Sequence, residues 1–386
     1  MQIPFSSSPR SSLGVEWELE LVDIETRELA QGRMASDILR ELSAPHGGEH
    51  PKAKHELLES CVEVITGICG TVDEAVADLR GTVDEVAAAA GARDVGLMCS
   101  GTHPFTDWST QELSPDPCYA KLIDDMQWLA RRLQIFGVHV HIGVRSPDKA
   151  IPIVNALTAY IPHFLGLSAS SPYWLGRDTG LASARSKIFE GLPTAGLPYQ
   201  LSGWDDFEQF METLISSGTI STIREVWWDV RPHPQFGTVE LRICDGLPTL
   251  TEVGWAAAMS QCLVEMFNSQ LDKGYTLPTP KRWTVRENKW RAARYGIEAD
   301  ILVDDQGSTV PMRDLVVDLV DELMPFAERL GCTKELATAR DMLDVGPSAQ
   351  RQRAVAEAND GDLRAVVDSL LQEMREDAPG SAMVSS

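Results

Sequence analysis

Carboxylate side chains recur at every second position near the start of the chain. Glu16, Glu18 and Glu20 alternate with apolar residues in the segment LGVEWELELVD. Alternation with a period of two predicts a β-strand, on which these carboxylates project to one face about 7 Å apart. No Lys or Arg lies between them, so they are screened by water, protonated or bound to cations. An ordinary half-exposed strand shows the same alternation.

Three further segments alternate in the same way and carry side chains that can bind metals. His139 and His141 alternate with apolar residues in IFGVHVHIGV, and Glu240 and Arg242 do so in TVELRICD. Glu63 occupies the equivalent position in CVEVIT. Taken singly, a His-x-His strand can be a solvated pair, and Glu-x-Arg can be a surface ion pair.

One arrangement would explain all four segments together. If their apolar faces pack on helices, the opposite face of one sheet carries five carboxylates, two imidazoles and a guanidinium. Without metal, such a surface would suffer strong like-charge repulsion, and its carboxylate-rich donors suit Mg²⁺ or Mn²⁺. We call this surface the acidic floor, and its predicted members are Glu16, Glu18, Glu20, Glu63, His139, His141, Glu240 and Arg242. Two further carboxylates, Glu56 and Glu59, lie just upstream of Glu63 in the sequence.

Two clusters of basic residues stand out in an otherwise acidic chain. Arg177, Arg185 and Lys187 lie in the glycine-rich segment 171–198, and Arg291 is followed by a second arginine three residues later. Arginine binds carboxylate and phosphate through paired hydrogen bonds, although a solvated charged face has the same composition. No P-loop or GxGxxG sequence is present. Acidic floor, divalent metal and arginines together favour phosphoryl transfer.

The elements that must position these side chains predict an α+β fold. Strands and helices do not alternate as βαβ units, so we expect an antiparallel sheet with helices on one face. The predicted strands span residues 13–23, 61–66, 95–99, 135–144, 225–230 and 238–245, with a turn at 231–234 and a long functional loop at 171–203. The predicted helices span residues 71–90, 118–133, 150–169 with breaks at its two prolines, 205–216, 249–272 and 286–296, and mostly helical structure follows residue 313.

Composition restricts the setting in which this protein works. Acidic residues exceed basic ones by 57 to 34, giving a net charge of −23, which disfavours nucleic acid and anionic membranes as partners. The seven scattered cysteines form no CxxC pair, and neither a secretory signal nor an apolar run of spanning length is evident. We therefore expect a cytoplasmic protein with buried thiols. A flexible N-terminus (1–12), one catalytic domain (13–376, with a helical part from about 313) and a flexible tail (377–386) are predicted.

The chain resembles a known family of enzymes. The similarity to the glutamate–cysteine ligase type 2 family of bacterial carboxylate–amine ligases covers about residues 13–300. It is carried by six segments in this order: GVEWELELVD, ELLESCVEVITG, FGVHVHIGV, SPYWLGRDTGLASARSKIF, WWDVRPHPQFGTVELRICD and NKWRAARYG.

This resemblance implies a fold like that of glutamine synthetase, with a curved antiparallel sheet whose open face holds Mg²⁺ (or Mn²⁺) and ATP and whose other face carries helices. It also implies ATP-dependent amide formation, in which the γ-carboxylate of glutamate takes the ATP γ-phosphate and an amine, cysteine in the named reaction, displaces phosphate. Small-molecule substrates are thus expected, and a homo-oligomer is left open.

The resemblance also implies roles for particular residues. Glu16, Glu18, Glu63, His141 and Glu240 would be metal ligands or close to them. Glu240, Arg242 and Arg185 would be catalytic, with Arg242 neutralising the transferred phosphoryl group. Arg177 and Arg185 would hold substrate carboxylate or phosphate, and Arg177, Lys187, Asn288 and Arg291 would bind the cofactor. Trp17 stands where the family more often has an acidic residue, and the alternation places it on the packed face.

Three other functions fit parts of the pattern. A metal-dependent hydrolase would use His139 and His141 with a metal-bound water. A non-catalytic relative would bind Mg-nucleotide without turnover. A glycosidase would use two of the carboxylates but leaves the basic clusters without a role.

Overall fold

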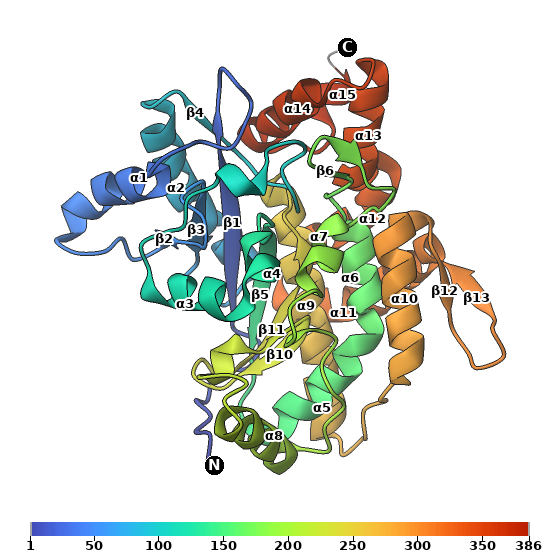
Figure 1. The fold of residues 1–386 in the computed structure, drawn as a ribbon. Helices are drawn as coiled ribbons and strands as arrows, with labels where there is room; N and C mark the ends of the chain where they lie inside the picture. The colour runs from blue at the N-terminus through green and yellow to red at the C-terminus, as the bar shows by residue number, and fades with distance from the viewer. Residues whose placement is uncertain (1, 385–386) are drawn as a thin grey trace.

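An open seven-stranded β-sheet organises the structure, which is a computed structural model describing residues 2–384 (Figure 1). All its strand pairs are antiparallel, as predicted. The order is β10-β11-β5-β1-β3-β2, and β4 pairs with the far end of β1. The strands are β1 (Leu13–Asp23), β2 (Ala53–His55), β3 (Cys61–Ile65), β4 (Val95–Met98), β5 (Gly137–Gly143), β10 (Val230–His233) and β11 (Thr238–Asp245).

One face of the sheet packs on helices and forms the main hydrophobic core. Most apolar residues of β1, β3, β5 and β11 enter this core, where they meet α2 (Val72–Gly91), α5 (Pro147–Leu157), α6 (Ile161–Ser168) and α9 (Leu250–Asp272). Trp17 is fully buried there, and its indole Nε1 donates to the Leu247 carbonyl at 3.0 Å. The predicted packing of one face is confirmed.

Capping side chains fix where the two long core helices begin. The Thr71 hydroxyl accepts a hydrogen bond from the Glu74 N–H while the Glu74 carboxylate binds the Thr71 N–H. At α9, the Thr249 hydroxyl accepts from the Glu252 N–H. Each cap satisfies backbone donors that the first helical turn leaves open, and both starts agree with the prediction.

The predicted apolar helix at 150–169 is two helices. A 3₁₀ turn at Thr158–Tyr160 separates α5 from α6, and Pro162 lies in the first turn of α6, where proline is tolerated. By length and hydropathy alone, Pro147–Ser168 could cross a membrane, but 83% of that window is buried inside the fold. This segment is therefore core structure, packed on α9 and on α10 (Arg282–Tyr295).

Two other predicted elements have different limits in the structure. The helix expected at 118–133 is interrupted at Gln127, whose φ of 49° ends α3 (Pro117–Met126) before α4 (Trp128–Arg131). The turn expected at 231–234 is instead strand β10, with Pro232 on the edge of the sheet, where its missing N–H costs no ladder bond. The actual turn follows it, and Gly237 (φ 65°) leaves room for the Ser6 carbonyl.

The segment expected to be a long loop contains regular structure. It holds β6 (Tyr173–Trp174), β7 (Arg177–Asp178), α7 (Ala184–Phe189) and β8 (Ala195–Gly196), which pairs with β9 (Trp227–Trp228). Ser183 caps α7 by accepting from the Ser186 N–H. This short capped helix places Arg185 against β11, where it contacts the Arg242 carbonyl at 3.4 Å.

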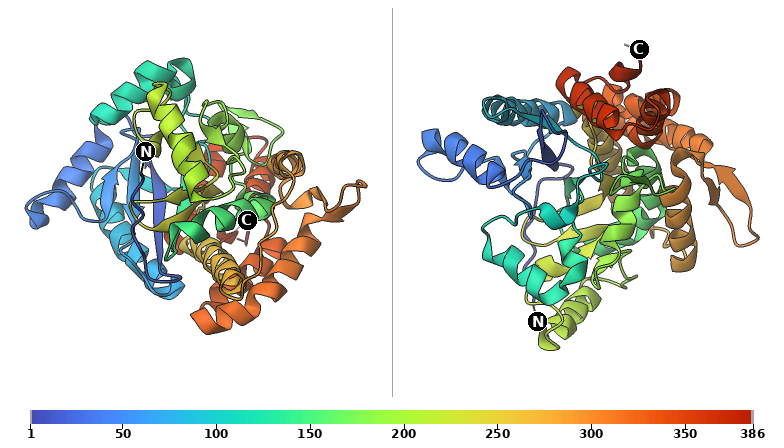
Figure 2. Two further views of the ribbon diagram at one scale, coloured as in Figure 1. Left: turned by 90° about the horizontal axis from the view of Figure 1, so that it is seen from below. Right: turned by 45° about the horizontal axis from the view of Figure 1, so that its top comes forward.

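Helices make up most of the remaining chain (Figures 1 and 2). The C-terminal helices gather at one end, and the hairpin β12–β13 projects from the body beside α10. Their bounds are α1 (Met34–Ser43), α8 (Trp204–Ser216), α10 (Arg282–Tyr295), β12 (Asp300–Leu302), β13 (Thr309–Pro311), α11 (Met312–Leu330), α12 (Thr333–Val345), α13 (Ser348–Ala358), α14 (Leu363–Glu376) and α15 (Ser381–Val384), and single 3₁₀ turns lie at Ala44–His46, Trp108–Thr110, Ile223–Glu225 and Gly296–Glu298.

The terminal segments for which flexibility is predicted make specific contacts. Arg10 forms ion pairs with Glu265 and Asp272 of α9, at 2.7 and 2.6 Å. The Thr251 N–H donates to Asp377 at 2.8 Å, and the Gly380 N–H donates to a carboxylate of α14. All seven cysteines are free thiols; six are buried as expected, and Cys118 is exposed.

Candidate active site

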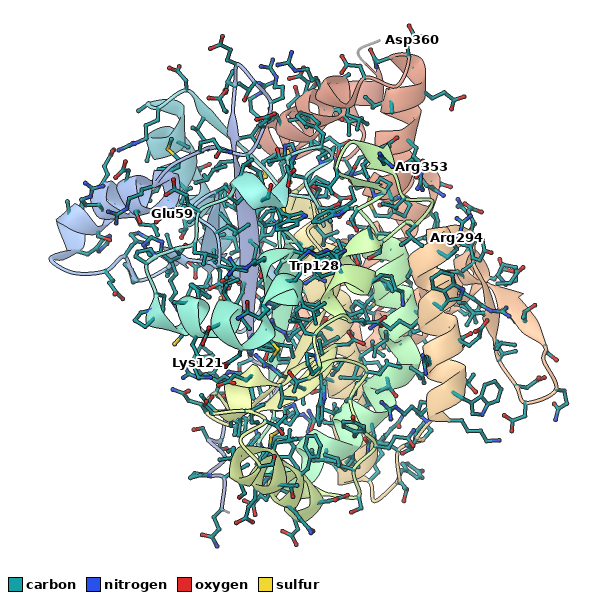
Figure 3. All side chains as sticks on the ribbon, viewed as in Figure 1. Glu59, Lys121, Trp128, Arg294, Arg353 and Asp360 are labelled. Atoms are coloured by element: carbon teal, nitrogen blue, oxygen red, sulfur yellow. The ribbon has the colours of Figure 1, made fainter. Side chains whose placement is uncertain are left out.

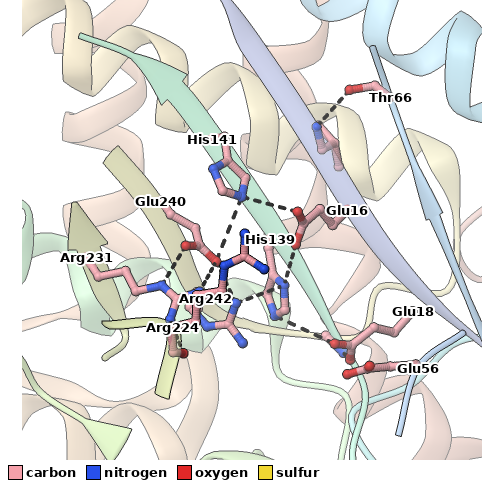
Figure 4. A network of polar contacts seen from close by, with 12 residues as sticks. Glu16, Glu18, Glu56, Thr66, His139, His141, Arg224, Arg231, Glu240 and Arg242 are labelled. Carbon is pink, nitrogen blue, oxygen red and sulfur yellow. Dashed lines mark hydrogen bonds and ion pairs between the residues drawn. The ribbon is translucent and has the colours of Figure 1, made fainter. Parts of the chain in front are cut away.

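The strand register brings the predicted acidic floor together on the open face of the sheet. Glu16 on β1 lies directly opposite His139 on β5, and Glu18 lies opposite Glu63 on β3. His141 is in turn opposite Glu240 on β11. Directly opposed residues project to the same face, so segments more than two hundred residues apart in sequence share one surface (Figure 4).

Two groups of side chains within this floor have the spacing of metal ligands. Glu16, His141 and Glu240 form one group, and Glu16, Glu63 and His139 form the other, with ligand atoms within 4.8 Å of one another in each group. His141 Nε2 lies 3.4 Å from Glu16 and 3.8 Å from Glu240. Two carboxylates per imidazole make an oxygen-rich donor set, which suits Mg²⁺ or Mn²⁺ better than Zn²⁺.

Both histidines leave a buried nitrogen without a hydrogen bond. His141 Nδ1 contacts the Thr238 hydroxyl at 3.0 Å, which orients the ring and turns Nε2 toward the carboxylates. His139 Nδ1 contacts Glu16 at 3.2 Å, and its Nε2 lies 3.8 Å from Glu18. Within residues 2–384, the buried Nε2 atoms of both rings have no hydrogen-bond partner. Such orphaned atoms are costly in a folded protein, and a bound cation would satisfy them.

Arginine side chains close the floor on the β11 side. The Glu240 carboxylate is bound by Arg231 Nε at 2.6 Å and by Arg242 Nη1 at 2.5 Å. Arg242 lies where the β11–β5 register shifts, and its backbone N–H donates outside that ladder to the Asp229 carbonyl at 2.8 Å. Irregularities of this kind re-aim a side chain next to active sites. Here the shift keeps the guanidinium within 3.4 Å of His139 Nδ1.

Electrostatic effects divide the carboxyls of the floor into two classes. Burial by itself would raise the pKa of Glu240, but the charges of Arg231 and Arg242 hold it well below its usual range. Burial is likewise outweighed at Glu16, where the hydrogen bond with His139 and the neighbouring His141 ring lower the pKa. These two carboxyls are ionised at neutral pH.

The remaining carboxyls lie in the opposite class. Burial and then Glu56 raise the pKa of Glu18 to about 8, and burial with Glu16 and Glu56 raises the pKa of Glu63 well above its usual range. The pKa of His139 falls to about 4 through burial and then Arg242, which keeps its ring neutral and able to bind metal. More carboxyls than fixed cations thus share the floor.

Glu20 and Arg185, two further residues predicted for the site, are buried and contact backbone or side-chain groups near the floor. Glu20 is fully buried and accepts hydrogen bonds from the N–H and hydroxyl of Ser100, each at 2.9 Å. Arg185 contacts the Arg242 carbonyl at 3.4 Å, and its buried Nε has no partner. A Cβ at Gly137 would lie 2.2 Å from Arg185 Nη2, so only glycine admits the guanidinium at this point.

Glu56 and Tyr119 belong to the site although neither is predicted as a functional residue. The Tyr119 hydroxyl donates to Glu56 at 2.7 Å, and burial raises the pKa of that carboxyl. Glu56 lies beside Glu18 in Figure 4. The sequence points to Glu56 only through its closeness to Glu63, because periodicity does not indicate which way a side chain outside a strand points.

The residues predicted to bind the cofactor are dispersed. Asn288 is buried and bonds both ways with the Leu302 backbone, at 2.9 Å each, so it holds β12 to α10. Arg177 is exposed on β7, in a loop that Arg353 pins through Asp178 (Figure 3). Lys187 pairs with Glu190, and Arg291 donates to the Asp300 carbonyl. The nucleotide roles of these residues stay predictions.

One cavity opens on the acidic floor, and a second lies beside α10 with no floor residue in its lining. The first, which we call the apolar cavity, has a volume of about 510 Å³ and reaches Glu18, His139 and Arg242. The second, the wide hollow, has a volume of about 1200 Å³ and is lined by Lys187, Arg291 and neighbours on α10. A buried chain of charges joins the hollow to the floor, since Lys289 pairs with Glu190 and with Asp229, whose carbonyl binds the Arg242 N–H.

Similar proteins were found both among curated sequences and among solved structures. A protein of Frankia alni named "Putative glutamate--cysteine ligase 2-1" is 64% identical over 380 residues, covering 98% of this chain and 99% of that protein. The crystal structure of the glutamate–cysteine ligase of Francisella tularensis in complex with AMP matches with a TM-score of 0.67 at 14% identity, covering 99% of this chain and 92% of that chain.

A bifunctional glutathione synthetase from Pasteurella multocida matches with a TM-score of 0.65 at 15% identity, over 95% of this chain and 52% of that one. Both structural likenesses confirm the glutamine-synthetase-like fold class predicted from the sequence. The family model described as glutamate-cysteine ligase family 2 matches residues 12–369. These matches show that the chain is a carboxylate–amine ligase and belongs to glutamate–cysteine ligase family 2.

Proposed function

We propose that the protein is an ATP-dependent ligase that joins the γ-carboxylate of glutamate to an amine, with cysteine as an acceptor and γ-glutamylcysteine as the product. The observation that carries the proposal is the convergence of Glu16, His141 and Glu240 with Arg242 on one sheet face. Family membership supplies the reaction class, and this convergence supplies a place where a triphosphate and a carboxylate could meet.

Divalent cations are part of the proposal because the donor set fits them. Glu16, Glu63, His139, His141 and Glu240 would hold Mg²⁺ or Mn²⁺, and Glu18 lies 3.8 Å from His139 Nε2, beside the second group. The bound ions would neutralise the phosphate oxygens and the carboxyl charge of the floor. The orphaned imidazole nitrogens and the surplus of carboxyls over arginines both support this assignment.

In the first step, a γ-carboxylate oxygen of glutamate would attack the γ-phosphorus of ATP, and ADP would leave. Arg242 is held by Glu240 at the floor, where it would face the charge that develops on the phosphoryl oxygens. Arg185 offers a buried guanidinium with an unused Nε toward the glutamate carboxylate or the phosphate. Lys187 and Arg291 line the wide hollow, which has room for the nucleoside part of ATP.

In the second step, the amine nitrogen would attack the acyl phosphate, releasing phosphate and a proton. The apolar cavity opens on the floor beside Glu18 and His139, shares no lining residue with the wide hollow, and would give the amine a separate approach. Separate approaches matter because the acyl phosphate must be shielded from water until the amine arrives.

A cytoplasmic location belongs to the same proposal. ATP and glutamate are intracellular substrates, and all seven cysteines are free thiols. The net charge of −23 leaves nucleic acid and anionic membranes disfavoured as partners.

Phosphate release provides the direct test. Purified protein incubated with Mg-ATP should release phosphate only when glutamate and an amine are both present, with one γ-glutamyl amide formed per phosphate, as measured by coupled colorimetry and mass spectrometry. ATP cleavage that ignores glutamate, or turnover that persists in excess chelator, would contradict the proposal. Nucleotide binding without any turnover would instead favour the non-catalytic alternative.

Removing one imidazole should weaken metal binding. In His141→Ala, Glu16 and Glu240 lose the shared donor that lies 3.4 and 3.8 Å from them, and we expect Mn²⁺ affinity to fall about 10- to 100-fold. Titration of free Mn²⁺ followed by electron paramagnetic resonance measures this without turnover. His163→Ala is the matched control, since that buried histidine lies on α6, in the helical layer; an equal loss there would refute the assignment.

A metal-dependent hydrolase is less well supported. Zinc hydrolases commonly present three ligands rich in histidine, whereas each ligand group here has one imidazole and two carboxylates. Metal analysis of the purified protein separates these functions, since bound zinc would favour the hydrolase.

A further inference from the structure

A second hydrophobic cluster lies on the open face of the sheet, apart from the main core. Its buried members include Leu57, Leu58, Leu133 and Leu192, and half-buried side chains from α3, α7 and β9 pack against them. Helix α3 contributes a stripe at helical spacing, formed by Tyr119, Leu122 and Met126. The open face of an acidic sheet is an unexpected place for apolar side chains that remain half exposed.

This cluster is the wall of the apolar cavity. Besides the stripe on α3, the cavity is lined by Ile135, Phe136, Phe189 and Trp227, and at its inner end it reaches Glu18, His139 and Arg242. Lys121, on the wall helix α3, and Trp128, at the start of α4, are labelled in Figure 3. An apolar chamber therefore opens directly onto the groups proposed to activate glutamate.

The charged residues at the cavity mouth are already engaged in local contacts. Lys121 pairs with Asp125 on the same helix. Asp116 caps α3 by accepting from the Cys118 N–H at 2.7 Å, and Glu225 closes the capping box with Thr222. These groups stabilise the walls, so the middle of the chamber offers a substrate apolar contacts rather than ion pairs.

We infer that this chamber binds the acceptor amine and selects primary amines with an apolar aliphatic or aryl body, larger than the side chain of cysteine. The inference rests on the proposed ligase function and specifies its second substrate. The amine nitrogen would point to the floor and bond to the γ-acyl carbon while the carbon–oxygen bond to phosphate breaks and one proton leaves to water. Cysteine would fill only part of a chamber of about 510 Å³.

The size of the effect follows from apolar burial. Each methylene moved from water into an apolar site favours binding about fourfold. Along the series ethylamine, propylamine, butylamine and pentylamine, kcat/KM for amide formation should therefore rise about fourfold per step. Cysteine should rank with the short members of the series.

Hydroxylamine separates this inference from the function on which it rests. It is small enough to trap an acyl phosphate without needing the apolar wall, and it yields a γ-glutamyl hydroxamate. Hydroxamate formation with a flat amine series would overturn the inference and leave the ligase function intact. No hydroxamate and no glutamate-dependent ADP would overturn both.

Variants locate the selectivity on α3. Leu122→Asn should reduce the pentylamine-to-ethylamine ratio of kcat/KM about tenfold while hydroxamate formation stays unchanged. Met126→Gln provides a second, independent variant of the same stripe. Leu315→Asn is the matched control, because Leu315 is also a half-buried helical leucine but lies on α11.

Other outcomes identify a different occupant of the chamber. If Leu122→Asn and Met126→Gln raise the KM for ATP and leave the amine ratio unchanged, the chamber holds the adenine and the inference is wrong. An equal fall of the ratio in Leu315→Asn would show a general effect on stability and would also overturn it.

Discussion

Replacing Arg242 with alanine should lower kcat for glutamate-dependent ATP cleavage by about a thousandfold or more. Loss of one arginine that stabilises a transferring phosphoryl group typically has an effect of this size. Arg242 Nη1 is held between the Glu240 carboxylate and His139 Nδ1, at 2.5 and 3.4 Å, so its guanidinium is fixed on the acidic floor. Single-turnover measurement with Mg-ATP and glutamate isolates the phosphoryl step from product release.

The fold should survive this substitution. Glu240 keeps its contact with Arg231 Nε at 2.6 Å, so the carboxylate is not left buried and unpaired. Arg242→Lys should retain part of the rate because it keeps a charge but loses the planar paired donors. Arg40→Ala removes an exposed ion pair with Asp37 on α1 and serves as the control. A rate near that of the unmodified enzyme in Arg242→Ala would exclude the assigned role.

Replacing Arg351 with methionine should produce the largest loss of stability, about 3–5 kcal/mol in the free energy of unfolding. Arg351 is buried on α13 and pairs with Glu373 of α14 at 2.8 Å and with Glu252 of α9 at 2.9 Å. Its Nη1 also donates to the Gly346 carbonyl at 2.6 Å. Without the guanidinium, two buried carboxyls face each other in the core, which denaturant unfolding at neutral pH would detect.

The pH dependence distinguishes this mechanism from simple loss of packing. Burial already raises the pKa of Glu252 in the presence of Arg351, and removal of the guanidinium raises it further. A carboxyl whose folded-state pKa exceeds its unfolded value loses stability as pH rises between the two values. The Arg351→Met protein should therefore be less destabilised at pH 5 than at pH 8, whereas a packing defect would show no such trend.

Two further variants complete this test. Adding Glu252→Gln and Glu373→Gln to Arg351→Met should restore much of the stability, because neutral groups no longer need the guanidinium. Arg340→Met removes an exposed pair with Asp321 and should have a much smaller effect. Equal losses for Arg340→Met and Arg351→Met would show that burial is not the decisive factor.

The alternating strands could be predicted because each has one apolar face that packs on helices and one polar face. Glu16, His139 and Glu240 each occupy the polar phase of a strand whose other phase is apolar, and that phase fixes which way they point. Which strands are neighbours could not be derived from periodicity. Placement of β5 between β1 and β11 depends on contacts between distant segments, and the resemblance to a known family supplied what the pattern lacked.

Residues outside the strands were harder to place. Arg177 and Arg185 look alike in a glycine-rich segment, yet Ser183 caps a helix that carries Arg185 under the sheet while Arg177 remains exposed. Asn288 has the side chain of a ligand but is bonded to the backbone of β12. Such outcomes depend on tertiary hydrogen bonds, which local composition does not encode.

The alternation of polar and apolar side chains along β1 and β5 has a consequence for how this gene can change over generations. Along each strand, polar side chains face the open side of the sheet and apolar side chains face the core. Because successive side chains point to opposite faces, an insertion or deletion of one codon would turn carboxylates or imidazoles toward the core and apolar side chains toward solvent. We therefore expect homologous genes to differ by substitutions within these strands, and by insertions and deletions mainly in the connecting loops.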